Sequence, residues 1–190
     1  MQLDPEFPFV HLPQWLGPAQ ADALLAHLEA RSDWTQGSVR MFGRHVPEPR
    51  LTLFEADPGI NYTYAQRRLD GHGWSPELAK LRDDFRAHFD LEANTVLANL
   101  YRDGRDSMGW HRDREPELGP DPHIASLSLG AARDFDVRSD TDGSMHRFTL
   151  SHGDLLIMGT QSQTKWTHRV PKRLKIKNLR INLTFRHVFC

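Results

Sequence analysis

Two stretches in the first half of the chain carry apolar residues at helical spacing. Residues 17–34 begin with a proline in the expected first turn and place Leu24 and Leu28 on one stripe. Residues 75–91 follow the same plan, with Ser75 at the expected cap position and apolar side chains repeating along one face. The pattern predicts two amphipathic helices.

After residue 94 the pattern changes to short runs of alternating apolar and polar residues. Glycine- and aspartate-containing turns separate these runs, which is typical of strands. The predicted strands cover residues 95–102, 123–130, 134–139, 146–151, 154–159, 167–171 and 180–188. Many short strands without helices between them indicate a barrel or sandwich of the jelly-roll kind. We therefore predict an α+β fold in one domain over 1–190, with N-terminal helices in 1–92 and a jelly-roll core in 93–190.

Composition and charge indicate where the protein is located and which kinds of partner it has. Cys190 is the single cysteine, so no disulfide framework is possible, and a reducing, intracellular location is expected, either cytoplasmic or at the nucleoid or nucleus. The N-terminus has no signal-peptide pattern, and no run of about 18 apolar residues predicts a membrane span. The net charge is −1, but residues 164–190 hold eight basic residues and no acid. This asymmetry indicates either a face for a polyanion or a solvated, lysine-rich loop.

A histidine and an aspartate stand two residues apart in the segment GWHRDREPEL, residues 109–118. His-Arg-Asp also begins the catalytic loop of protein kinases, but that loop needs an asparagine where this chain has Leu118. On an extended strand His111 and Asp113 would point to the same side. With His168 they would form the two-histidine, one-carboxylate set of non-haem iron(II) oxygenases. A zinc site with a bound water is a second possibility.

The C-terminal segment RINLTFR places polar and apolar residues in strict alternation. Arg180, Asn182, Thr184 and Arg186 would share one face of a strand, and the apolar residues between them would share the other. A buried row with two arginines is costly unless it meets anions, and a guanidinium pairs naturally with a carboxylate. The alternative is an outer, solvated sheet face.

Five ordered motifs together resemble a known family. They are NLYRDGRDSMGWHRDREPEL, HIASLSLGAARDF, HGDLLIMG, THRVP and RINLTFR. This set is similar to the AlkB-type 2-oxoglutarate and iron(II)-dependent dioxygenases, and closest to the branch of small AlkB homologues that act on duplex DNA. The resemblance runs from about residue 40 to the C-terminus. It implies a jelly-roll core of the double-stranded β-helix type, preceded by a nucleotide-recognition hairpin region.

The resemblance also implies an activity and its cofactors. The expected reaction is oxidative demethylation of bases such as 1-methyladenine and 3-methylcytosine in DNA, coupled to 2-oxoglutarate decarboxylation, with release of formaldehyde and succinate. Fe(II), 2-oxoglutarate as cosubstrate and O2 are the expected cofactors. The expected partner is alkylated DNA, with RNA left open, and we expect a monomer. Two alternatives stay open: an oxygenase of the same fold acting on a protein or small molecule, and a non-catalytic nucleic-acid-binding module.

Residue roles follow from the resemblance position by position. The iron ligands match His111, Asp113 and His168. The cosubstrate contacts match Asn99, Tyr101, Arg180, Asn182, Thr184 and Arg186, with Arg180 on the far carboxylate. The base pocket matches Tyr62, Tyr64 and Glu115, although ordinary sheet packing is the alternative for the two tyrosines.

The segment RMFGRHVPEPR matches a hairpin that inserts an apolar side chain into the base stack. Met41 and Phe42 would form the wedge, and Arg44, with Arg40 and Arg50, would lie on phosphates. The alternative for Phe42 is a place in the protein core.

Overall fold

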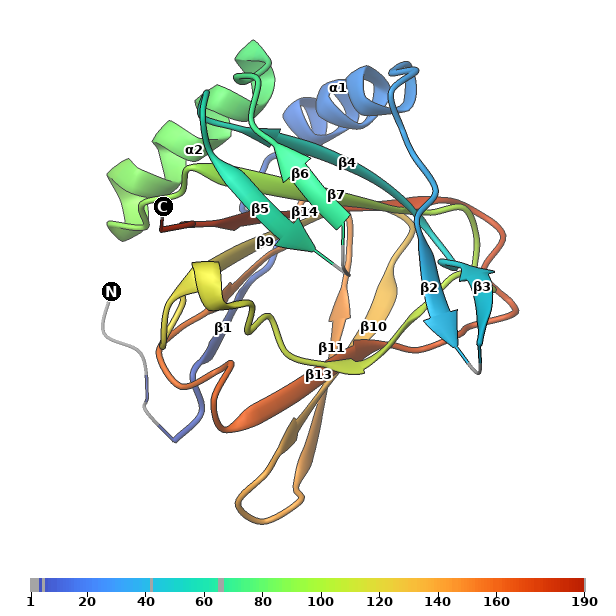
Figure 1. Ribbon diagram of the computed structural model, residues 1–190, viewed down its shortest axis with the longest axis vertical. Helices are drawn as coiled ribbons and strands as arrows, with labels where there is room; N and C mark the ends of the chain where they lie inside the picture. Colours follow the sequence, from blue (N-terminus) through green and yellow to red (C-terminus); the bar gives the residue numbers. More distant parts are fainter. Residues whose placement is uncertain (1–3, 5, 42, 65–66, 190) are drawn as a thin grey trace.

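Two antiparallel β-sheets enclose the interior of the molecule (Figure 1). The computed structural model describes residues 4, 6–41, 43–64 and 67–189. The larger sheet has the strand order β1-β12-β9-β14-β7-β4, and the smaller sheet has the order β11-β10-β13-β8. The larger sheet contains β1 (Phe9–Leu12), β4 (Leu51–Ala56), β7 (Thr95–Tyr101), β9 (Ile124–Gly130), β12 (Leu155–Met158) and β14 (Arg180–Arg186). The smaller sheet contains β8 (Met108–His111), β10 (Arg133–Ser139), β11 (Met145–Leu150) and β13 (Trp166–Val170).

All seven strands predicted after residue 94 are present, and the predicted jelly-roll core is confirmed. Two short hairpins add to the sheets. They are formed by β2 (Ser38–Met41) with β3 (Arg44–Pro47), and by β5 (Asn61–Tyr64) with β6 (Arg67–Asp70). Both precede the second helix in the chain, in the region where the sequence predicted nucleotide recognition.

The helices α1 (Pro18–Glu29) and α2 (Pro76–Phe89) cover the outer face of the larger sheet. Their apolar stripes are buried as predicted, and burying each leucine or phenylalanine stabilises the fold by about 1.5–3 kcal/mol. Ser75 occupies the N-cap position of α2, but its hydroxyl donates to Glu55 Oε2 at 3.0 Å instead of capping the helix. No helix in the described part of the chain is long and apolar enough to cross a membrane.

Strand β14 lies in the middle of the larger sheet and has two different faces. It pairs with β7 on one side and with β9 on the other, so its backbone donors and acceptors are satisfied on both edges. Ile181, Leu183 and Phe185 point toward the helices and join the larger apolar core. The polar residues of the same strand therefore point into the space between the two sheets, as the alternation predicted.

The space between the sheets is apolar at one end and polar at the other. A second core contributed by both sheets fills the apolar end, and it includes Phe9, Ile124, Phe148 and Trp166. A third cluster joins hairpin β5–β6 to β7 and to the short 3-10 helix η1 (Pro116–Leu118). The polar end between these clusters holds the three predicted metal ligands.

Candidate metal centre and cosubstrate pocket

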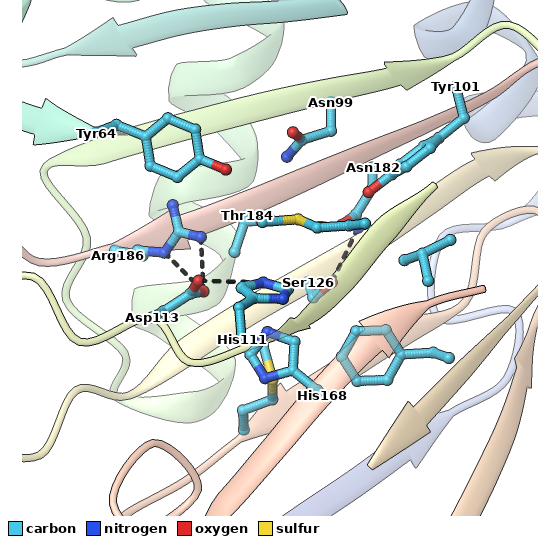
Figure 2. Close-up of a pocket in the computed structure, with 14 residues that line it drawn as sticks. Tyr64, Asn99, Tyr101, His111, Asp113, Ser126, His168, Asn182, Thr184 and Arg186 are labelled. Atoms are coloured by element: carbon cyan, nitrogen blue, oxygen red, sulfur yellow. Dashed lines mark hydrogen bonds and ion pairs between the residues drawn. The ribbon is translucent and has the colours of Figure 1, made fainter. Parts of the chain in front are cut away.

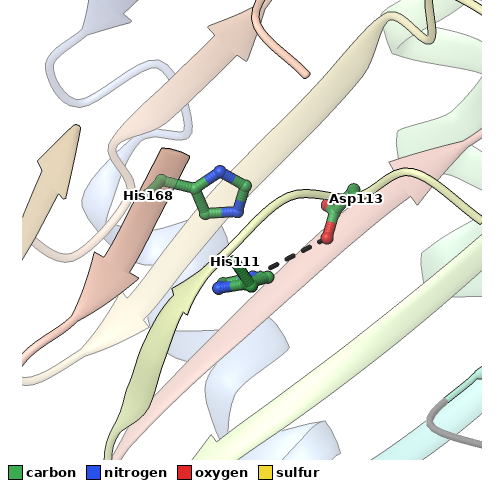
Figure 3. A group of neighbouring side chains, drawn as sticks. All are labelled: His111, Asp113 and His168. Carbon is green, nitrogen blue, oxygen red and sulfur yellow. Dashed lines mark ion pairs between the residues drawn. The ribbon is translucent and has the colours of Figure 1, made fainter. Parts of the chain in front are cut away.

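The three predicted iron ligands converge at the polar end of the barrel (Figure 3). His111 ends β8 and His168 lies on the neighbouring strand β13, where the two residues are directly paired in the sheet. Asp113 lies in the loop after β8, so it is not on a strand as the sequence suggested. One ligand atom from each of the three residues lies within 4.8 Å of the others. We call these three residues the triad.

The protonation states of the triad suit a metal cation. Burial and, next in size, the neighbouring His111 lower the pKa of His168 to about 3, so this imidazole is neutral. Burial also lowers the pKa of His111. For Asp113, burial favours the neutral acid, but this effect is outweighed, mainly by the charge of the nearby Arg186, and the pKa stays well below its usual range. Two neutral imidazoles and one carboxylate anion are the forms that bind metal.

Hydrogen bonds to neighbouring groups orient the side chains of the triad. His111 Nδ1 lies 2.8 Å from the carbonyl oxygen of Gly109, which can only accept, so Nδ1 carries the proton and Nε2 keeps its lone pair. Arg186 donates to Asp113 Oδ2 through Nη2 at 2.6 Å and through Nε at 3.1 Å. Among the described residues, buried His168 Nδ1 has no hydrogen-bond partner. The donor set therefore fits a divalent iron ion with open coordination positions.

Gln163 is a residue of this centre that the sequence did not reveal. It is fully buried, and its Oε1 accepts from the backbone N–H of Asp113 at 2.8 Å. This bond fixes the loop that carries the carboxylate ligand. No sequence signal marks it, because an isolated glutamine 50 residues away from its partner has no local pattern.

Five of the six predicted cosubstrate residues line one pocket together with the triad (Figure 2). The pocket is lined by Tyr64, Asn99, Tyr101, Met108, His111, Asp113, Ser126, Phe135, Met158, His168, Val170, Asn182, Thr184 and Arg186. Asn182 of β14 pairs with Asn99 of the adjacent strand β7, so the two amides face the same interior. The side chains that the sequence placed on one face of β14 thus meet those of β7, and the alternative of an outer, solvated face is wrong.

Arg180 is buried next to this pocket, and its surroundings leave guanidinium donors available to an anion. It is 1% exposed, its Nη2 donates to Ser128 Oγ at 2.9 Å, and its Cζ lies 5.4 Å from the centre of the Tyr101 ring. Burial lowers the pKa of Arg180 to about 10. Its Nε and Nη1 have no hydrogen-bond partner among the described residues. A buried guanidinium with free donors fits a carboxylate group of a ligand.

The two predicted base-pocket tyrosines share a face of β5 but have different surroundings. Both are buried, and their ring centres are 6.1 Å apart. Tyr64 lines the pocket, whereas Tyr62 packs against Phe54 in the cluster under hairpin β5–β6. Burial raises the pKa of Tyr64 to about 12, so its phenol is neutral at physiological pH. Glu115 lies in the loop after Asp113, and burial followed by the charge of Asp113 raises its pKa.

The predicted wedge hairpin is present as β2 and β3, with Gly43 at the turn in the left-handed region at φ 77°. Phe42 lies outside the described residues, as do the side chains of Arg40 and Met41, so their predicted roles stay predictions. Arg44 is exposed on β3. The expectation that Arg50 lies on phosphates is wrong, because its side chain is 6% exposed and bonds three other side chains.

The fold and the centre together define a class of protein: a jelly-roll oxygenase with a two-histidine, one-carboxylate metal site. A family model described as 2OG-Fe(II) oxygenase superfamily matches residues 8–186. Human DNA oxidative demethylase ALKBH2 is 38% identical, over 90% of this chain and 70% of its own length. Mouse alpha-ketoglutarate-dependent dioxygenase alkB homolog 3 is 36% identical, over 93% of this chain and 65% of its own length.

Solved structures agree on the fold. The structure of OsALKBH1 gives a TM-score of 0.66 at 20% identity, covering 98% of this chain and 100% of that chain. A Pseudomonas putida prolyl-4-hydroxylase gives 0.57 at 17% identity, covering 95% and 92%. The chain belongs to the 2OG-Fe(II) oxygenase superfamily and, within it, to the AlkB-type dioxygenases. Its cofactors are Fe(II), 2-oxoglutarate and O2, as predicted, and the zinc alternative is set aside.

Proposed function

We propose that this protein is a DNA oxidative demethylase that removes N-linked methyl groups from alkylated bases of the 1-methyladenine and 3-methylcytosine type. The observation that carries the proposal is the triad in one pocket with Tyr101, whose ring the buried Arg180 contacts, in the interior of an AlkB-type barrel. The demethylase and dioxygenase names of the relatives support it. The two alternatives, an oxygenase for another substrate and a binding module without catalysis, have no comparable support.

The residues would divide the work as follows. His111, Asp113 and His168 would hold the ferrous ion, with Arg186 keeping the carboxylate in place. Arg180 would bind the far carboxylate of 2-oxoglutarate, which gives its free donors a partner. The amides and hydroxyls of Asn99, Tyr101, Asn182 and Thr184 would surround the cosubstrate. Bound iron, together with 2-oxoglutarate and O2, supplies the oxidising power that hydroxylates the methyl carbon.

The substrate side of the pocket would be formed by aromatic and acidic side chains. A base methylated on a ring nitrogen carries positive charge, which an aromatic face and a carboxylate both favour. Tyr64 lines the pocket that contains the triad. Tyr62 packs with Tyr64 in the cluster under hairpin β5–β6, and Glu115 lies near Tyr62 and Asp113. After hydroxylation, the hydroxymethyl group on nitrogen breaks down to formaldehyde and the unmodified base, and succinate and carbon dioxide are the products of the cosubstrate.

The same proposal includes where the protein acts. Because its substrate would be DNA, the protein would act inside the cell, at the chromosome. We propose that the protein acts as a monomer, and activity on RNA is a further outcome that the same assay can score.

One experiment tests the proposal directly. A DNA oligonucleotide carrying 1-methyladenine is incubated with the protein, Fe(II), 2-oxoglutarate and ascorbate, and its mass is measured. Loss of one methylene-equivalent mass that depends on both Fe(II) and 2-oxoglutarate is the expected result. Turnover of 2-oxoglutarate with no change in the mass of any methylated oligonucleotide would favour an oxygenase with another substrate. No turnover of 2-oxoglutarate would favour a binding module.

A further inference from the structure

Arg50 bonds two side chains that line the pocket. It directly precedes β4 and is 5% exposed. Its Nε donates to Asn99 Oδ1 at 2.9 Å, and its Nη2 donates to Tyr64 Oη at 2.8 Å. Asn99 and Tyr64 both line the pocket that contains the triad (Figure 2). One guanidinium therefore contacts the predicted cosubstrate side and the predicted base side at once.

The bond to Asn99 decides which part of its amide faces the pocket. A guanidinium only donates, so the amide oxygen must turn toward Arg50. The NH2 group is then left for the pocket, and no described residue accepts from it within hydrogen-bonding distance. Without Arg50 the amide could equally present its oxygen, which repels the oxygen atoms of an anionic ligand. Arg50 thus makes Asn99 a donor toward the cosubstrate.

The bond to Tyr64 ties hairpin β5–β6 to the barrel. Tyr64 lies on β5, which pairs with β6 to form a separate two-stranded sheet. Its phenol oxygen accepts from Arg50, which leaves the hydroxyl hydrogen available for another acceptor. The planar guanidinium holds its two N–H directions in a fixed relation, so a shift of Tyr64 changes the bond to Asn99 as well.

Glu48 completes the connection between the hairpin and the barrel. It is 2% exposed, and its Oε1 accepts from Arg50 at 3.1 Å. Its Oε2 accepts from Arg67 of β6 at 3.0 Å. Gly37 leaves room for this carboxylate, because a Cβ at that position would lie 2.4 Å from Glu48 Oε2. Both strands of hairpin β5–β6 are therefore tied to Arg50, one directly and one through Glu48.

We propose that Arg50 is a positioning residue that makes binding of 2-oxoglutarate and binding of the methylated base depend on each other. The proposal rests on the proposed function and adds a coupling within its active site. An occupied cosubstrate site would fix the Asn99–Arg50–Tyr64 chain and so preorganise the base side. Coupling between two binding sites is reciprocal and typically changes affinity by about 5- to 150-fold.

The experiment measures both affinities on the full chain with Mn(II), without turnover. The dissociation constant of a 1-methyladenine oligonucleotide is measured with and without saturating 2-oxoglutarate, and that of 2-oxoglutarate with and without the oligonucleotide. In the wild type each ligand should tighten the other by about fivefold or more. In Arg50→Met this factor should fall below about twofold, and Arg50→Lys should not restore it, because an ammonium cannot hold both partners in the same planar geometry.

Arg82→Met is the matched control. Arg82 lies on α2 and pairs with Asp57 at 3.2 Å, outside the pocket, so the coupling factor should match that of the wild type. Equal coupling in wild type and Arg50→Met would overturn the proposal, as would absence of coupling in the wild type or its loss in Arg82→Met. If Arg50→Met does not fold, Tyr64→Phe decides, because it removes only the oxygen that Arg50 binds; unchanged coupling there overturns the proposal. Demethylation by the wild type with Fe(II) is scored separately, so its absence would refute the proposed function.

Discussion

Replacing Arg180 with methionine should weaken 2-oxoglutarate binding without destabilising the ligand-free protein. The guanidinium is buried beside Ser128 and Tyr101, and its Nε and Nη1 have no partner among the described residues. Most buried arginines stabilise the fold through an ion pair, so their removal leaves an acid without a partner. The free donors of Arg180 indicate the opposite situation: the partner arrives with the ligand.

The magnitudes follow from the structure. Burial lowers the pKa of Arg180 from 12.5 to about 10, which corresponds to roughly 3 kcal/mol against the charged form in the folded protein. The hydrogen bond to Ser128 offsets about 1 kcal/mol of this. Arg180→Met should therefore leave the free energy of unfolding of the ligand-free protein unchanged or raise it by up to about 2 kcal/mol. A ligand carboxylate without its guanidinium loses about 2–5 kcal/mol, and 2 kcal/mol alone weakens binding about 30-fold.

Thermal unfolding with Mn(II), with and without 2-oxoglutarate, measures both effects. At a concentration of 100 times the wild-type dissociation constant, the ligand should stabilise the wild type by about 2.7 kcal/mol, or roughly 5–10 °C. A 30-fold weaker site reduces this to about 0.9 kcal/mol, or roughly 2–4 °C. Arg180→Lys should recover only part of the difference, because a point charge does not make the planar double contact. Equal stabilisation of wild type and Arg180→Met by 2-oxoglutarate would refute the assignment.

Three further predictions concern the metal, the DNA and the fold. Alanine at any one triad position should abolish iron-dependent turnover, whereas His123→Ala and His146→Ala should stay active; near-normal activity in a triad variant would show that the residue is not a ligand. Phe42→Ala should impair repair of double-stranded far more than single-stranded substrate at nearly unchanged melting temperature; loss of a core phenylalanine would instead cost roughly 3–5 kcal/mol and lower both activities alike. For Asp136, burial raises the pKa, but hydrogen bonds from two arginines outweigh it and leave the pKa below its usual value. The stability from Asp136 should be present at neutral pH and disappear below about pH 4, so urea unfolding should show the deficit of Asp136→Asn shrinking on acidification; a constant deficit would contradict this.

The strands and their faces follow from local patterns. The alternation in RINLTFR has a period of two, and a strand has the same period, so the separation of Asn182 and Thr184 from Leu183 needed no knowledge of the fold. The two helices followed in the same way from a period of 3.6. The sequence also determined which residue types are available for a metal, and the order of motifs indicated the family.

The partners of the buried charges came only from the tertiary structure. The sequence placed Arg50 among arginines near a hairpin and so suggested phosphate contact, but Tyr64 lies 14 residues away and Asn99 lies 49 residues away. Arg186 was expected in the cosubstrate pocket, which it lines, but only the structure shows that its guanidinium bonds Asp113, 73 residues away in the sequence. Such contacts depend on strand order and on where a loop leaves its strand. Strand periodicity is a local property of the chain and predicts the face on which a side chain lies. The buried charge that the side chain meets there depends on which distant strand or loop is its neighbour, and this is decided only when the two sheets close around their interior.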